Sequence, residues 1–180
     1  PRWGLGAIHL VTGIVLPWAP GMENSGDRYD ESAYVASIAE GSGTIYVAGH
    51  FRTLAGQPRE GLAEFDVASG MLTSWAPALG PLYPWIAHFN YALVVTDSTV
   101  MVGGTFREVG GQARDCIAEI QRGTAQPTPW NPRVSDHVLA LARAGGAVFA
   151  GGWFTFVGDW QSRVNVAALD ATTGRLRDWN

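Results

Sequence analysis

Cysteine, lysine and charge in general are scarce in this sequence. Charged residues make up 16% of the chain, and all 12 basic residues are arginine. The lone Cys116 excludes an internal disulfide, which fits a reducing compartment as well as an exported bacterial protein that needs no disulfide. The arginines are scattered along a chain with a net charge of −4, so no basic cluster forms and we expect no nucleic-acid partner.

Long apolar runs are also missing. The most apolar stretch near the start, residues 5–20, is broken by Gly, His and Pro. No segment reaches the roughly 20 apolar residues that a helix needs to span a bilayer, so we expect no membrane-spanning segment. The chain begins with Pro1 and shows no export signal, which leaves an upstream segment open.

Signatures of catalysis and of metal binding are equally scarce. The sequence has no Gly-x-Ser-x-Gly elbow, phosphate loop or paired-carboxylate motif. Cys116 begins an apolar run and is expected to be a small buried residue. The histidines lack the spacing of metal ligands and stand at His9, His50, His88 and His137. A non-catalytic protein without a cofactor is therefore favoured, although enzymatic activity stays open.

The chain is rich in apolar residues, glycine and proline. Hydrophobic residues make up 47% of it, and it contains 23 Gly and 10 Pro. This is enough apolar material for a core, and Gly and Pro between short apolar runs indicate many turns and many short strands. The composition therefore predicts an all-β fold.

One segment recurs three times, as an apolar run that ends in a small pair and a phenylalanine. Its copies are TIYVAGHF at 44–51, TVMVGGTF at 99–106 and AVFAGGWF at 147–154. Tryptophan recurs with the same period of about 50 residues, which is typical of propeller blades and longer than most helical repeats. The recurring tryptophans are Trp18, Trp75, Trp130 and Trp179. We expect them to fill gaps between blades rather than to form a site.

Each complete unit is expected to hold four antiparallel strands. The first strand covers 35–39, 91–95 and 138–142 in the three units, and the second is the recurring apolar run. The third covers 62–65, 117–120 and 166–169, and the fourth carries the tryptophan. Glycine inside a strand is costly, so the small pairs at 48–49, 103–104 and 151–152 predict close backbone packing or a bulge.

The repeat resembles a known group, the delta-60 repeats, also called domain of unknown function 5122. The resemblance rests on the Gly-Gly-x-Phe run, on Val-Gly-Gly-Gln, on Leu-Ala-x-x-Asp-x-x-Thr-Gly and on Trp-x-Pro, and it covers nearly the whole chain. The layout is also similar to the kelch repeat. The chain departs from the pattern at Ala48, Gln121 and Gly158-Asp159. The resemblance implies a β-propeller in an exported bacterial protein and supplies no catalytic motif.

The phase of the repeat predicts about 3.5 blades within one propeller domain. Closed propellers use about 4–8 blades, so we expect the missing strands to come from the rest of the same chain or from another subunit. The expected divisions are 1–20 for the second half of a first blade, 21–77 for a second blade with an acidic insertion, 78–132 for a third blade with an aromatic insertion, and 133–180 for a fourth blade.

Two kinds of long connection are expected to share one face of the propeller. The turns from first to second strand and from third to fourth strand are short, whereas the other two connections lie on the opposite face and vary. Aromatic side chains beside polar groups can stack on sugars or anchor a protein. The candidate binding residues on this face are Tyr83, Trp85, His88, Phe89, Arg59, Arg114, Trp160 and Arg163.

The insertion at 21–34 is acidic and offers a candidate calcium site. Its ligands would be Asp27, Asp30 and Glu31, because hard cations take clustered oxygen ligands. Their spacing lacks the regular Asp-x-Asp-x-Asp form, so a solvated surface loop is the simpler interpretation.

These features together predict a non-catalytic scaffold or interaction module of an extracellular, cell-surface or periplasmic bacterial protein. Its loops would meet a protein or a glycan. Two alternatives stay open, namely part of a propeller enzyme that acts on an extracellular polysaccharide and a structural subunit of a large assembly. Titratable side chains that converge on a central channel would favour the enzyme.

Overall fold

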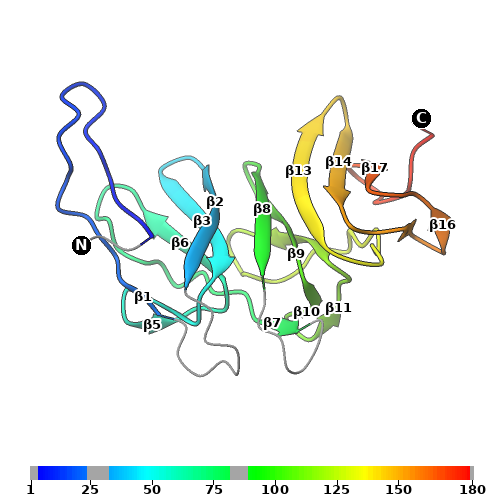
Figure 1. Ribbon diagram of the computed structural model, residues 1–180, viewed down its shortest axis with the longest axis horizontal. Coiled ribbons are helices and arrows are strands. Elements are labelled where there is room, and N and C mark those ends of the chain that lie inside the picture. The colour runs from blue at the N-terminus through cyan, green and yellow to red at the C-terminus, as the bar shows by residue number, and fades with distance from the viewer. Residues whose placement is uncertain (1–3, 24–32, 82–88, 179–180) are drawn as a thin grey trace.

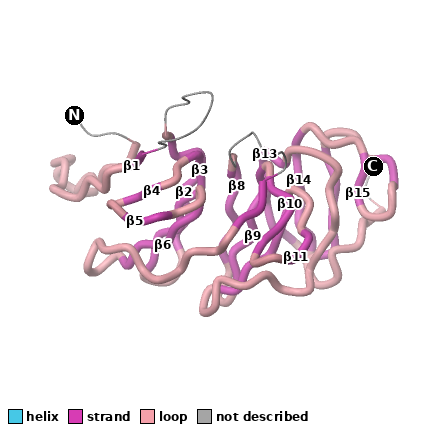
Figure 2. Tube along the Cα trace, turned by 90° about the horizontal axis from the view of Figure 1, so that it is seen from below, coloured by secondary structure: helices cyan, strands magenta, loops and turns pink. Residues whose placement is uncertain are grey.

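The computed structural model describes residues 4–23, 33–81 and 89–178 (Figure 1). These residues form strands, turns and loops only (Figure 2), so the all-β fold that composition predicts is confirmed for them. Because the described residues contain no helix, they contain none that could cross a membrane.

Three sheets repeat the same antiparallel order, in which the second strand of each unit lies between the first and the third. Short turns connect the first two strands, and in the last unit Gly145-Gly146 has positive φ at both positions, as a tight two-residue hairpin requires. The sheets are β2 (Tyr34–Glu40), β3 (Thr44–His50) and β6 (Leu62–Asp66); β8 (Asn90–Val95), β9 (Thr99–Gly104) and β12 (Ile117–Gln121); and β13 (Val138–Ala144), β14 (Ala147–Gly152) and β17 (Val166–Asp170). The first three strands predicted for each unit are therefore present.

The fourth strand of each unit is reduced to a single bridge, which differs from the four-strand prediction. The bridges join Phe65 to Leu72, Ile120 to Pro127 and Leu169 to Leu176. In the second complete unit the bridge falls on Pro127, which has no N–H to donate to a neighbouring strand. Two residues before the tryptophan a threonine turns the chain away, since the N–H of Trp75 bonds Thr73 Oγ1 and that of Trp130 bonds Thr128 Oγ1. The chain thereby leaves the sheet, and the tryptophan side chain reaches the next unit.

A second, small sheet stands at one end of each unit, where the sequence predicts only loops. A hairpin in the connection between the second and third strands pairs with the segment that follows the preceding tryptophan. These strands are β1 (Met22–Glu23) with β4 (Thr53–Leu54) and β5 (Gln57–Pro58), β7 (Leu79–Pro81) with β10 (Phe106–Val109) and β11 (Gln112–Ala113), and β15 (Phe156–Val157) with β16 (Gln161–Ser162). In the last unit Val134 replaces the third strand by a bridge to Val157. The two long connections of each unit therefore do lie together, as predicted, and we call their surface the hairpin face.

The core consists of three clusters, each between successive units. Side chains along the middle strands β3 and β9 alternate between clusters, as the pleat requires, so that both faces of the first two sheets are buried. Along β3, Val47 faces the first cluster while Tyr46 and Ala48 face the second. Along β9, Val100 and Val102 face the second cluster while Met101 faces the third.

The recurring tryptophans close these interfaces. The indole N–H of Trp18 donates to the Gly70 carbonyl at 2.8 Å, that of Trp75 to Gln121 at 3.1 Å and that of Trp130 to Asp170 at 3.0 Å. Each acceptor lies in the following unit, either at the end of the third strand, as Gln121 and Asp170 do, or in the turn after it, as Gly70 does. The prediction that these tryptophans fill gaps between units is thus confirmed for all three, and Trp179 lies outside the described residues.

The recurring glycines mark a close approach between the first and second strands. A Cβ at Gly49, Gly104 or Gly152 would lie 2.1, 2.5 or 1.9 Å from a carbonyl oxygen of the first strand or of the residue before it. The register of the first strand shifts at the same level, between Val35 and Ser37 in the first complete unit and at the equivalent places in the others. Both expectations, close packing and a bulge, are confirmed.

The three sheets stand in a row, with β2 next to β8 and β8 next to β13 (Figure 1). The described residues form no closed ring, so the propeller arrangement stays a prediction. An N-terminal hairpin, held by a bridge from Ile8 to Val15, adds half a unit before the first sheet.

Candidate functional site

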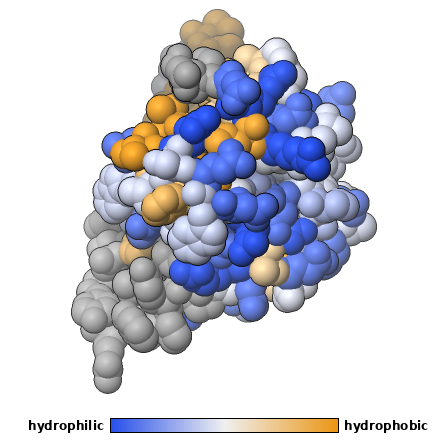
Figure 3. All heavy atoms as spheres, turned by 90° about the vertical axis from the view of Figure 1, so that its right-hand side faces the viewer, coloured by the Kyte–Doolittle hydropathy of each residue, from blue (hydrophilic) through white to orange (hydrophobic). Residues whose placement is uncertain are grey.

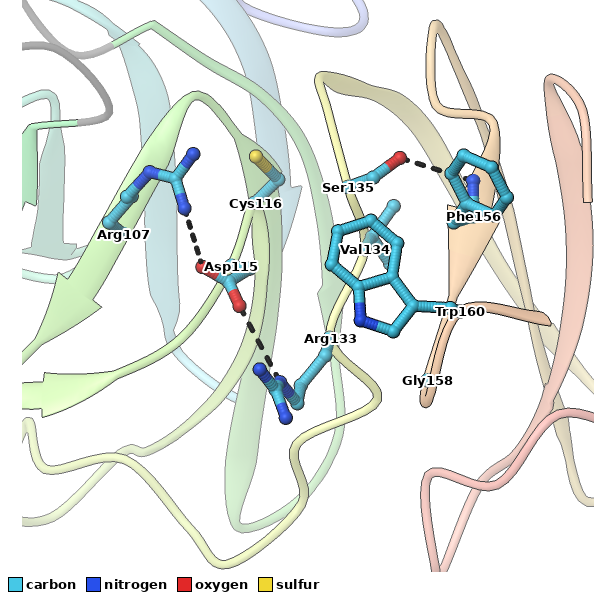
Figure 4. A pocket seen from close by; sticks show the side chains of 9 residues that line it. All are labelled: Arg107, Asp115, Cys116, Arg133, Val134, Ser135, Phe156, Gly158 and Trp160. Carbon is cyan, nitrogen blue, oxygen red and sulfur yellow. Dashed lines mark hydrogen bonds and ion pairs between the residues drawn. The ribbon is translucent and has the colours of Figure 1, made fainter. Parts of the chain in front are cut away.

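A hollow of about 160 Å³ opens on the hairpin face between the hairpin of β10 and β11 and the hairpin of β15 and β16, beside the junction of the last two units (Figure 4). Arg107, Asp115 and Cys116 line it from the unit of β9, and the hairpin of β15 and β16 lines it from the other side. The linking segment after Trp130 forms its floor. The remaining lining residues are Arg133, Val134, Ser135, Phe156, Gly158 and Trp160.

Trp160 is the most unusual residue of this hollow. It is 77% exposed, and its φ of 61° lies in the left-handed region, which bulky residues rarely occupy. The last hairpin turns through three residues, 158–160, whereas the other two hairpins turn through two residues and place Gly56 and Gly111, with φ of 72° and 74°, before their second strand. The indole stands edge-on to Phe156, with ring centroids 5.5 Å apart. A large aromatic side chain is therefore held in solvent on a turn that is one residue longer than those of the other units.

Arg133 is a second departure from the repeat in the same hollow. Its carbonyl accepts the N–H of Gly158 at 2.8 Å, just as Gly21 accepts from Ala55 and Ala78 from Gly110. The scaffold uses only the main chain at this position and elsewhere holds a glycine or an alanine. The arginine side chain is thus extra to the fold.

Asp115 lies between two arginines in this hollow. Its carboxylate is 3.4 Å from Arg107 Nη1 and 3.7 Å from Arg133 Nε, and the two arginine side chains are 54% and 60% exposed. Such exposed pairs contribute little to stability. The Arg133 contact uses Nε only, so the two Nη groups have no protein partner among the described residues.

Cys116 is buried behind the hollow. Burial raises the pKa of its thiol to about 12, and the nearby carboxylates of Asp136 and Asp115 act in the same direction. The thiol is therefore neutral near pH 7 and is no nucleophile. Its burial agrees with the prediction from the sequence.

Arg59 and Arg114 belong to the candidate residues of the sequence, and both are buried inside their own units. The Nη2 atom of Arg59 donates to the Thr73 carbonyl at 2.7 Å, and Arg114 makes the equivalent bond to Thr128 at 2.5 Å. Burial lowers the pKa of both guanidinium groups. The two arginines tie the small hairpin to the segment before the tryptophan.

The other candidates are divided between the surface and segments that the structure does not describe. Trp160 reaches the hollow, whereas Arg163 contacts the Ser162 carbonyl and does not line it. Phe89 stacks on His50 at 4.5 Å between ring centroids and is half-buried. Outside the described residues lie Tyr83, Trp85, His88, Asp27, Asp30 and Glu31. The described residues hold no group of three or more His, Cys, Asp or Glu suited to a metal.

Sequence reasoning missed Arg133, Arg107 and Phe156. A signal for Arg133 was present, because the residue after Trp-x-Pro is Gly21 and Ala78 in the other units. A position that holds a small residue in two units and a long charged residue in the third is not constrained by the fold. The contact between Arg107 and Asp115 depends on the hairpin pairing, which the sequence did not predict.

Comparisons with known proteins bear on the fold alone. No family model matches the sequence, and no curated protein matches it. Among solved structures, the chain is similar to the computationally designed Ika8 protein, with a TM-score of 0.52 and 16% identity over 96% of this chain and 42% of that one. The computationally designed Ika4 protein has a TM-score of 0.49 at 16% identity, over 88% of this chain and 76% of that one. The chain thus spans less than half the length of Ika8.

Proposed function

We propose that this chain is a section of a β-propeller and a non-catalytic interaction module, whose hairpin face binds a protein or glycan partner. Exposed Trp160 carries the binding part of this proposal. Holding a bulky residue in the left-handed region costs about 1–3 kcal/mol, and such strain concentrates at functional sites. The other hairpins turn with one residue fewer and have glycine as the last turn residue, so the repeat does not call for a tryptophan here.

The propeller part of the proposal is supported by the repeated units. Each has the same strand order, the same tryptophan contact to the next unit and the same pairing between its two long connections. First strands of successive units lie side by side, as they would around an axis. An exported or cell-surface location rests on the likeness of the repeat to the delta-60 repeats.

The sheet edge of the N-terminal half-unit supports the proposal that another strand pairs with it. Among the described residues, the segment around Ile8 pairs only with that around Val15. Its equivalents β6, β12 and β17 are each covered on the other edge by a middle strand. The matching edge here would take a hairpin of the same repeat type, from the rest of the propeller chain or from another subunit.

An array of glycans and peptides probed with the wild-type chain and with Trp160→Gly tests the proposed function. We expect at least one ligand class to bind the wild type and to be lost in the variant, whose fold should be kept because glycine readily adopts the left-handed conformation of this residue. Equal binding by both proteins would refute the hairpin-face assignment. Turnover of a polysaccharide in a parallel hydrolase screen would show an enzyme instead.

A further inference from the structure

The two departures from the repeat, Trp160 and Arg133, line the same hollow. They come from different segments, one from the turn of the last hairpin and one from the link that precedes β13. Main-chain bonds fix these segments to each other, because Gly158 N–H donates to the Arg133 carbonyl and Ser135 N–H donates to that of Phe156. The main-chain positions of Arg133 and Trp160 relative to each other are therefore fixed before a ligand binds.

We propose that this hollow binds a sugar ring that carries a carboxylate, such as a uronic acid residue of an acidic polysaccharide. This rests on the proposed function and names its ligand. The indole of Trp160 offers a flat apolar face for the C–H face of a pyranose. Arg133 offers the planar pair of Nη groups that matches a carboxylate bidentately.

The charges and size of the hollow agree with this ligand. Arg107, Asp115 and Arg133 carry a net charge of +1 in a chain whose net charge is −4. The Asp115 carboxylate lies beside both guanidinium groups and can accept hydrogen bonds from ring hydroxyls. A volume of about 160 Å³ is below the ~300–1,000 Å³ of sites that enclose whole small molecules, so it suits one ring of a longer chain.

Asp159 allows a test of whether the ligand is negatively charged. It is exposed and precedes Trp160 in the turn. Its carboxylate opposes an anionic ligand, so Asp159→Asn is expected to bind an acidic sugar about twofold more tightly at low salt. For a neutral sugar the same change is expected to have no effect.

Titration calorimetry of the full chain with trigalacturonate, neutral cellotriose and a hexaglutamate peptide tests the proposal. We expect trigalacturonate to bind more tightly than either other probe. Trp160→Gly and Arg133→Ala, which introduce the small residue types of the sister units, should each weaken it at least tenfold. Matched controls are Trp153→Ala, an exposed tryptophan outside the hollow, and Arg143→Ala on β13, which should both stay within twofold.

The outcomes separate this proposal from the proposed function. Equal affinity for trigalacturonate and cellotriose, or unchanged affinity in Arg133→Ala, would overturn the carboxylate assignment. Tighter binding of hexaglutamate would overturn the saccharide class. In either case the hairpin face would still stand as a binding face if Trp160→Gly removed the ligand found on the array. No loss of any ligand in that variant would overturn both.

Discussion

At the scale of single residues, the repeat separates side chains that build the fold from side chains that are free of it. Three tryptophans donate to carbonyls at the end of the next unit's third strand or in the turn after it, and two buried arginines bond equivalent threonine carbonyls. These roles repeat, so they belong to the scaffold. Trp160 and Arg133 have no counterparts in the sister units, and their surroundings require only a backbone. Departure from the repeat is therefore the better guide to function in this chain.

Trp160→Gly is expected to stabilise the protein. Glycine adopts the left-handed conformation without the clash that a Cβ suffers, so the free energy of unfolding should rise by about 1 kcal/mol. Urea denaturation of the wild type and the variant measures it. Trp153→Ala, which removes an exposed tryptophan that is not in this conformation, should give no such rise. A large loss of stability in Trp160→Gly would mean that the indole serves the fold.

Cys116 makes stability depend on pH in the alkaline range. The folded thiol has a pKa of about 12 against 9.0 for an ordinary thiol, so the folded state keeps its proton while the unfolded chain loses it. Stability from this group is complete below pH 9 and should fall as the pH rises toward 12. Comparing the unfolding free energy of the wild type and Cys116→Ala between pH 8 and 11 measures the difference. Parallel curves would contradict the assigned burial.

The sequence could predict residue roles where they repeat and could not where they depend on pairing. The recurring Trp and Gly were interpreted correctly because period and spacing identified them. The sequence predicts a binding surface for Arg59 and Arg114 because it indicates a loop where the structure has a hairpin. Once that hairpin forms, the guanidinium groups turn inward to the carbonyls of Thr73 and Thr128. Nothing in the local sequence indicates that these side chains point inward.

At the scale of elements, apolar alternation located the first three strands of every unit. It failed for the fourth strand, because a single bridge and a departing Trp leave too few paired residues for a pattern. It failed also for the small hairpins, whose strands of two to four residues are shorter than the period-2 signal needs. Their tight turns at Ala55-Gly56 and Gly110-Gly111 were the available clue.

Gly152→Ala is expected to weaken the contact between β13 and β14. The new Cβ would lie 1.9 Å from the His137 carbonyl oxygen, so the first strand must move, at a cost of about 2 kcal/mol or more. Thermal or urea unfolding measures the loss. Gly123→Ala is the matched control, since its Cβ meets nothing within 4 Å and should change stability by less than about 0.5 kcal/mol. Equal effects would show that the close approach is not tight in solution.

At the scale of the whole molecule, the two ends of the row of units differ. The side at the C-terminal end is mostly hydrophilic, with one small apolar patch (Figure 3). At the other end, an apolar hollow of about 620 Å³ lies between the N-terminal half-unit and the first complete sheet. Several large apolar side chains of the half-unit are exposed, among them Leu10 at 97% and Val11 at 86%. The proposed pairing of this edge with another unit would cover this exposed apolar surface.

Supplying the two strands that the half-unit lacks is expected to stabilise the chain. A copy of residues 34–61 fused ahead of Leu5 would place a middle strand on the free edge near Ile8, as β3 lies on β6. The urea midpoint should rise and binding of a hydrophobic dye should fall. The same fusion with the copies of Ile45 and Val47 changed to Asp is the control. No difference between the two fusions would count against a propeller edge.

The central claim is that the hairpin face binds and the opposite turns only connect strands. Hydrogen–deuterium exchange of the full chain with and without trigalacturonate tests it most directly, because it reports every part of the surface in one experiment. The account predicts added protection at 133–135 and 156–163. Protection instead at the opposite turns, 42–43, 97–98 and 145–146, would contradict it.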